Sequence, residues 1–112
     1  MKILLHVAEL DKVEVSLGNA KNFLEIDENA KIEIILNGSA VILLQEKVAK
    51  NINIYESISK LVKRNVNICI CNNSIKRFDI DKEKLCSFAK IVPAGIIEIA
   101  KKQEEGYSYV KI

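Results

Sequence analysis

Short apolar runs of strand length alternate along this chain with stretches in which apolar residues recur at helical spacing. The short runs predict strands at residues 2–7, 31–37, 66–71, 90–93 and 107–112. Strands that alternate with helices are typical of an α/β fold, because the helices provide the crossovers that parallel strands need. The pattern therefore predicts an α/β fold with a mainly parallel sheet.

The helical stretches lie between these strands, and a short polar side chain precedes four of them. Such side chains accept hydrogen bonds from the first backbone N–H groups of a helix. The predicted N-caps are Asp11, Ser39, Asn53 and Asp81, for helices through Leu24, Val48, Val62 and about Phe88. A fifth helix, at residues 96–105, ends before Gly106, which suits the left-handed position after a helix. The strand ending at Cys71 is predicted to continue into a loop.

Composition limits the class of protein. The chain has 112 residues, of which 49% are hydrophobic, mostly aliphatic. A chain of this length forms one domain, predicted here at residues 1–112, with a core that needs no disulfide or structural metal. The aliphatic richness fits a parallel sheet covered on both faces, and equally a chain that hides surface in an oligomer.

Targeting signals and cysteine usage indicate a cytoplasmic protein with free thiols. The first apolar run is too short for a signal peptide, and no run approaches the roughly 18 apolar residues of a membrane span. Three cysteines are an odd number, which argues against a disulfide framework. Cys69 and Cys71 lack a second Cys/His pair, and no glycine-rich phosphate loop is present. We therefore expect no metal, no cofactor and no membrane partner.

The net charge of +2 implies no nucleic-acid partner by itself. Basic side chains are concentrated in residues 41–77, at Lys47, Lys50, Lys60, Lys63, Arg64, Lys76 and Arg77, against the acidic Glu46 and Glu56. This patch could attract RNA or a small anion. A solvated helix face explains it better, because no aromatic residues are interleaved for base stacking. Nucleic acid is therefore not an expected partner.

Residues with useful chemistry follow several of the predicted strands. Ligands of open α/β sheets bind at the carboxyl ends of the strands. The candidates at these ends are His6, Asn37, Gly38, Cys71, Asn72, Asn73, Ser74, Pro93 and Gly95. We therefore expect these residues to converge on one rim of the sheet.

Cys71 is the best candidate for a reactive residue, because it closes a buried strand. From position alone a reactive and a structural role stay open, since the reactivity of a thiol depends on its pKa. Cys69 shares the same strand face one step deeper and is interpreted as a small buried hydrophobe. Cys86 is interpreted as a packing residue of a helix. His6 is either a hydrogen-bonded core histidine or part of the site.

Several motifs in this order resemble the DsrE/DsrF-like family over nearly the whole chain. They are His6-Val7, Leu17-Gly18-Asn19, Asn22-Phe23-Leu24, Asn37-Gly38 with Ala40-Val41, Cys71-Asn72-Asn73-Ser74 as C-x-N-S, Val92-Pro93-Ala94-Gly95 with Glu98 as V-P-x-G-x-x-E, and Gln103 to Lys111 as Q-x-x-G-Y-x-Y-x-K. The resemblance implies a three-layer α/β/α sandwich with a five-stranded parallel sheet. It also implies homo-oligomers, either trimers or hexamers.

The resemblance further implies a function in sulfur relay. The family cysteine that Cys71 matches accepts sulfane sulfur as a persulfide and passes it between partner proteins, so other sulfur-carrier proteins are expected partners. His6, Asn37, Asn72 and Ser74 would form the environment of the thiol. Whether the chain acts as a sulfurtransferase-like enzyme stays open. The alternative is a non-catalytic homo-oligomeric module that binds a small anion or other ligand in the same strand-end pocket.

Overall fold

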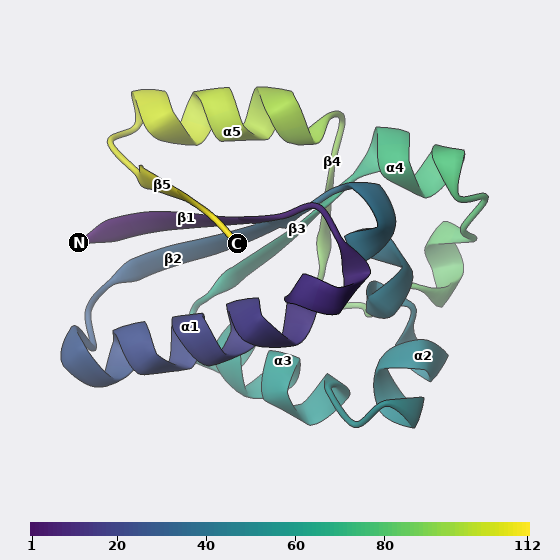
Figure 1. Cartoon of the computed structure of the whole chain (residues 1–112), viewed down its shortest axis with the longest axis horizontal. Coiled ribbons are helices and arrows are strands. Elements are labelled where there is room, and N and C mark those ends of the chain that lie inside the picture. The colour runs from purple at the N-terminus through teal and green to yellow at the C-terminus, as the bar shows by residue number, and fades with distance from the viewer.

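A computed structural model describes all residues from 1 to 112, and in it five parallel strands form one sheet (Figure 1). The strands are β1 (Lys2–Val7), β2 (Lys31–Leu36), β3 (Asn67–Cys71), β4 (Lys90–Val92) and β5 (Ser108–Lys111). Their order across the sheet is β4-β3-β2-β1-β5. All five predicted strands are confirmed, and their ends agree with the prediction to within one residue.

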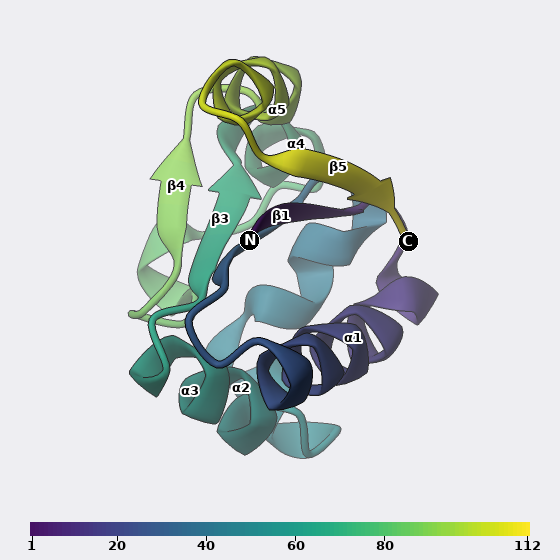
Figure 2. The same cartoon turned by 90° about the vertical axis from the view of Figure 1, so that its left-hand side faces the viewer.

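Helices cover both faces of the sheet, which confirms the expected three-layer α/β/α arrangement. Figures 1 and 2 show α1 (Val13–Ile26), α2 (Glu46–Asn51) and α3 (Tyr55–Lys63) on one side and α5 (Gly95–Glu104) on the other. A short helix, α4 (Asn72–Arg77), continues directly from the end of β3. No helix is both long enough and apolar enough to span a bilayer.

The two faces of the sheet are buried to very different extents. On the face under α1 and α3, 23 buried residues form one apolar cluster that includes Ile34 and Ile68. On the face under α5 the buried apolar cluster has four members, which are Leu4, Ile35, Cys69 and Ile99. Because side chains alternate along a strand, Glu33 and Cys71 also belong to this second face. The thinly packed face is therefore the one that carries the polar and sulfur chemistry.

The predicted helix capped by Ser39 is wrong as a single element. A 3-10 segment at Gly38–Leu44 precedes α2, and the Ser39 hydroxyl instead accepts a hydrogen bond from the backbone N–H of Leu10, at 3.0 Å. Asp11 lies inside a 3-10 turn before α1 and caps nothing. Asn53 has a φ of 61° and lies one residue before the N-cap of α3. The polar side chains at these three positions therefore do not cap the helices that they were expected to begin.

The region after Cys71 also differs from the prediction. Residues Asn72–Arg77 form α4 where a loop was expected, anchored by the fully buried Ile75. The expected helix through Phe88 is only a 3-10 turn at Lys82–Lys84, although Asp81 does cap it, accepting from the backbone N–H of Glu83 at 3.0 Å. The predicted C-terminal glycine of α5 is confirmed, because Gly106 has a φ of 92°.

Candidate functional site at the carboxyl rim

The carboxyl ends of β1, β2 and β3 bring His6, Asn37 and Cys71 to one rim on the α5 face. Parallel pairing places His6 opposite Ile35, and the backbone N–H of Asn37 donates to the carbonyl of Val7 at 3.0 Å. Because these strands run in the same direction, their last residues meet at the same edge. The predicted convergence of these strand ends is therefore present in the structure.

Gly95, the first residue of α5, packs closely against this rim. A Cβ atom added to Gly95 would lie 3.3 Å from the Asn37 Cβ and Nδ2 atoms and 3.5 Å from the Cys71 Cβ atom. The absence of a side chain lets the start of α5 approach both residues. Asn37, Cys71 and Gly95 therefore form one compact group.

The sulfur of Cys71 is surrounded by hydrogen-bond donors. Burial by itself raises the pKa of the Cys71 thiol, but hydrogen bonds from the Ser74 hydroxyl and from the backbone N–H groups of Gly95, Ser74 and Asn73 lower it by more. The net pKa of Cys71 therefore lies below its ordinary value. These N–H groups belong to the first turns of α4 and α5, where backbone donors have no partner within the helix.

Ser74 is held in place by a backbone contact with Gly38. The Gly38 N–H donates to the Ser74 hydroxyl oxygen at 2.8 Å, which leaves the hydroxyl hydrogen free to point at Cys71. Gly38 has a φ of 56°, and a Cβ atom there would lie 2.4 Å from the carbonyl oxygen of Ala8. Only glycine fits this position, so the Asn37-Gly38 turn positions a donor for the thiol indirectly.

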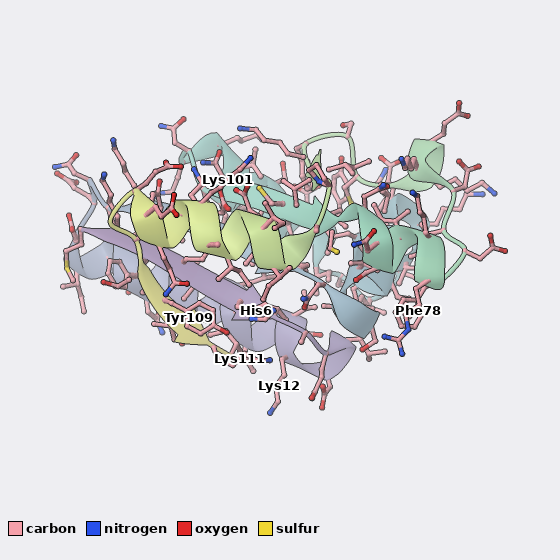
Figure 3. The ribbon with its side chains drawn as sticks, turned by 90° about the horizontal axis from the view of Figure 1, so that it is seen from above. His6, Lys12, Phe78, Lys101, Tyr109 and Lys111 are labelled. Atoms are coloured by element: carbon pink, nitrogen blue, oxygen red, sulfur yellow. The ribbon has the colours of Figure 1, made fainter.

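His6 lies in a hydrogen-bonded row with Tyr109 and Asn37. Its Nδ1 atom is 2.7 Å from the Tyr109 hydroxyl and its Nε2 atom is 2.9 Å from the Asn37 Oδ1 atom. An amide oxygen only accepts, so Nε2 carries the proton and Nδ1 accepts from the hydroxyl of Tyr109. Figure 3 shows Tyr109 and Lys111 beside His6. Burial lowers the pKa of His6, although the bond to Asn37 raises it, and the charge of Lys111 lowers it further.

His6 makes no hydrogen bond to Cys71, so its link to the thiol runs through Asn37. The neutral ring orients the Asn37 amide, whose Nδ2 end lies beside Gly95. His6 therefore contacts Asn37 and Tyr109 and makes no direct hydrogen bond to the thiol. His6 is thus half-buried and hydrogen-bonded at the rim, and a part in the chemistry of the site stays a prediction.

The other residues predicted for the site differ in their burial and in the groups that they contribute. Asn73 contributes its backbone N–H while its side chain is exposed, and Asn72 has a buried Oδ1 atom without a hydrogen-bond partner. Pro93 is exposed in the link between β4 and α5. Tyr109 was missed as a rim residue, although the pairing of β5 with β1 and the alternation of its side chains could have indicated it.

The other two thiols lie in less favourable surroundings. Burial raises the pKa of Cys69 to about 12, and the nearby Glu33 and Glu98 carboxylates add to this increase. Burial likewise raises the pKa of Cys86 to about 11. Both side chains are buried, as predicted, although Cys86 lies outside any helix. Cys71 is thus the one cysteine whose surroundings favour the thiolate.

Comparisons with known proteins identify both a family and a fold. The model of the DsrE/DsrF-like family matches residues 8–112. Among solved structures, the protein of unknown function MTH1491 from Methanobacterium thermoautotrophicum superposes with a TM-score of 0.88 at 22% identity, covering 99% of this chain and 98% of that one. The ychN protein from E. coli gives 0.80 at 19% identity, with full coverage of both chains.

A third structure, the conserved protein of unknown function BT1422 from Bacteroides thetaiotaomicron, gives a TM-score of 0.74 at 18% identity, covering 99% of this chain and 94% of that one. No curated protein matches the chain. At these identities the solved structures establish the shared fold.

Proposed function

Because the chain belongs to the DsrE/DsrF-like family, whose model matches residues 8–112, we propose that it is a sulfur-relay protein that carries a persulfide on Cys71. The observation that supports this most strongly is the group of donors around the Cys71 sulfur. A carrier thiol must react as the thiolate, and at an ordinary pKa only a small fraction is ionised at neutral pH. The donors from Ser74 and Gly95 increase that fraction.

The proposed transfer requires no oxidant. The Cys71 thiolate attacks the outer sulfur of a donor persulfide, R–S–SH, and a new S–S bond forms on Cys71. The donor's own S–S bond breaks, and the donor leaves as the thiolate R–S⁻ while the proton stays on the transferred sulfur. In the delivery step an acceptor nucleophile attacks the outer sulfur and Cys71 leaves as a thiolate. A low thiol pKa favours this second step, because it makes Cys71 a better leaving group.

The same backbone donors suit the persulfide anion as well as the thiolate. Amide N–H groups from α4 and α5 stabilise a negative charge without supplying a proton that would quench it. The hydrogen-bonded row of neutral side chains formed by Tyr109, His6 and Asn37 lies beside these donors. The expected partners are other sulfur-carrier proteins that present a thiol to this rim.

Mass spectrometry of the intact native protein tests this proposal. After incubation with a small-molecule persulfide such as glutathione persulfide, the chain should gain about 32 Da, the mass of one sulfur atom. Digestion should locate the added sulfur on Cys71. The variants Cys69→Ser and Cys86→Ser serve as matched controls and should load like the wild type. Equal loading of Cys71→Ser and the wild type would remove Cys71 as the acceptor.

We also propose that the chain forms homo-oligomers, as trimers or hexamers. Apolar side chains are exposed on α5 at Ile96 and Ile97 and on the edge strand β5 at Val110. An exposed edge strand beside apolar residues favours association. Light scattering should give a mass of three or six chains, and Ile97→Lys should reduce it. A monomer at micromolar concentration would contradict this proposal.

A second candidate is a binding module without sulfur transfer. The donors of Gly95, Asn73 and Ser74 that surround Cys71 would equally bind a small anion. In that case Cys71 should resist iodoacetamide in the native protein, and a small anion such as phosphate should raise the melting temperature. Fast alkylation of Cys71 without any thermal shift from anions would favour the carrier over the binding module.

A further inference from the structure

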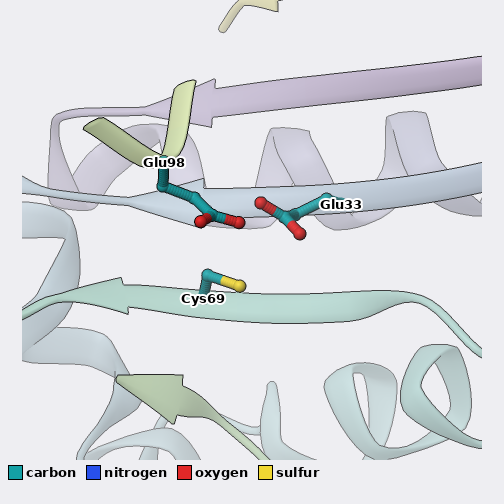
Figure 4. Close-up of side chains that lie close together, drawn as sticks. All are labelled: Glu33, Cys69 and Glu98. Carbon is teal, nitrogen blue, oxygen red and sulfur yellow. The ribbon is translucent and has the colours of Figure 1, made fainter. Parts of the chain in front are cut away.

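A second group of polar side chains lies under α5, deeper in the sheet than Cys71. Figure 4 shows Glu33 of β2, Cys69 of β3 and Glu98 of α5 pointing toward one another. One oxygen from each carboxyl group and the sulfur of Cys69 all lie within 4.8 Å of one another. Three elements that are distant in the sequence therefore bring three potential metal ligands to one point.

Glu33 is an unusual residue for this position. Its side chain is 2% exposed, and its Oε2 atom has no hydrogen-bond partner. The nearest cation is Lys102, whose Nζ atom lies 3.7 Å from the other oxygen, Oε1. A buried carboxylate oxygen without a partner is costly, because it has lost its water and gained no donor. The Glu98 and Cys69 side chains are therefore the groups that contact the Glu33 carboxyl from this side, and both can act as metal ligands with it.

The structure assigns a binding site for a divalent transition-metal ion of the Zn²⁺ type to Glu33, Cys69 and Glu98. Zinc takes thiolate and carboxylate ligands in tetrahedral geometry at bond lengths of about 2.0–2.3 Å. Such bonds hold the ligand atoms roughly 3.3–3.8 Å apart, so small side-chain rotations would close the group around an ion. The fourth position is left to water. The half-buried Glu98 provides the path of entry.

The local charges support a divalent cation. An ion with two positive charges, together with Lys102, would balance the three negative ligands. Binding would release the protons that these groups hold in the free protein.

The position of the site gives the ion a structural consequence. Glu98 lies one turn after Gly95 on α5, and Gly95 donates to Cys71. An ion shared by β2, β3 and α5 would fix the helix over the sheet on its thinly packed face. This inference does not depend on sulfur transfer at Cys71. It departs from the expectation of no metal site, because the ligands come from three separate elements and form no local motif.

Titration of the purified native protein with Co²⁺ and Zn²⁺ tests the assignment. Co²⁺ should bind one per chain and produce the near-ultraviolet band of a cobalt–thiolate bond. Cys69→Ser should abolish this band, and Glu98→Gln should weaken binding at least about tenfold, which is the scale seen when groups supporting a metal are lost. The matched control is Cys71→Ser, two residues along the same strand face, which should keep the band.

The outcomes separate this site from the rim. A band that persists in Cys69→Ser and disappears in Cys71→Ser would place the ion at the rim and overturn the assignment. Absence of a band in the folded wild type would overturn it as well, and would leave Glu33 and Glu98 sharing a proton. Because Glu98 is half-buried, Glu98→Gln should fold, and Zn²⁺ should raise the melting temperature of the wild type by more than that of this variant.

Discussion

Cys69 and Cys71 lie two residues apart on the same face of β3, yet their thiols have opposite properties. The pKa of Cys71 is lowered by the Ser74 hydroxyl and by backbone N–H groups, despite its burial. The pKa of Cys69 is raised to about 12 by burial and by two carboxylates. Two residues along the same strand face, the surroundings thus change from carboxylate acceptors at Cys69 to hydrogen-bond donors at Cys71.

The difference follows from where each residue lies relative to the strand end. Cys71 is the last residue of β3, so α4 begins beside it and the first turn of α5 reaches it through Gly95. Cys69 is inside the sheet, where the neighbouring strand and α5 present only side chains, here Glu33 and Glu98. Strand ends in a parallel sheet therefore suit anions, while interior positions suit neutral groups or cations.

The largest expected effect concerns Glu33, one of the two carboxyl groups that raise the pKa of Cys69. Its pKa is raised from 4.5 to about 8, so the folded chain binds this proton more tightly than the unfolded chain. The resulting stability is fully present below about pH 4.5 and is lost as the pH rises through about 8. The free energy of unfolding should fall by up to about 4 kcal/mol over this range in the presence of a chelator.

Glu33→Gln is the matching variant, because it keeps the shape and removes the charge. Its stability should vary much less between pH 5 and pH 8, measured by urea unfolding at each pH. Glu98 and Lys102 remain in the variant and set its residual pH dependence. A wild-type chain whose stability rises from pH 5 to pH 8 would contradict the raised pKa of Glu33.

Gly38, whose backbone N–H donates to Ser74, gives the next effect. Gly38→Ala would place a Cβ atom 2.4 Å from the Ala8 carbonyl oxygen at a left-handed φ of 56°, so we expect a loss of about 2–3 kcal/mol. The control is Gly18→Ala in the interior of α1, where nothing lies within 4 Å, which should stabilise by roughly 0.5–1 kcal/mol. Thermal unfolding of both variants measures this, and equal effects would contradict the role of Gly38.

The two thiols differ in how far the sequence alone predicts their surroundings. The rim was predictable, because strand ends in a parallel sheet converge whatever the details of the helices. His6, Asn37 and Cys71 were found in this way, and the C-x-N-S segment drew attention to Ser74. The roles of Gly38 and Gly95 as backbone donors required the coordinates, since a hydrogen bond from an N–H group leaves no trace in the residue type.

The deeper group was not predictable from the sequence. Glu33 interrupts an apolar strand, and such a residue is usually placed on an exposed face. Only the register between β2 and β3 and the position of α5 show that Glu33 faces Cys69 and Glu98. The helix after Cys71 was missed for a related reason, because Asn and Ser are weak helix formers and α4 depends on the burial of Ile75.

Alkylation provides a direct comparison of the two thiols. With the pKa of Cys69 at about 12 and that of Cys71 below its ordinary value of 9.0, their thiolate fractions at pH 7 differ by at least about 10³. The greater intrinsic nucleophilicity of the less acidic thiol offsets part of this and leaves a ratio of roughly 30–60 from ionisation alone. Iodoacetamide labelling with peptide mapping measures it, and in denaturant all three cysteines should react alike. Equal alkylation rates of Cys69 and Cys71 in the native protein would contradict the predicted difference between the two thiols.

The smallest expected effect isolates one donor. Ser74→Ala removes the hydroxyl that bonds to Cys71, so the pKa of this thiol should rise. Its alkylation at pH 7 should slow several-fold, because the greater nucleophilicity of a less acidic thiol offsets about half of the loss of thiolate on a logarithmic scale. The same change leaves the Gly38 N–H without its acceptor, which should cost roughly 1–3 kcal/mol of stability.

Ser39→Ala is the control for Ser74→Ala, because its hydroxyl accepts from Leu10 and has no hydrogen bond to Cys71. It should lose stability without changing the pH profile of Cys71 labelling. Labelling rates measured from pH 6 to pH 10 therefore separate the two serines. If both variants kept the wild-type profile, the backbone donors of α4 and α5 would be sufficient to stabilise the thiolate. The difference between Cys69 and Cys71 would then come from the ends of the helices alone.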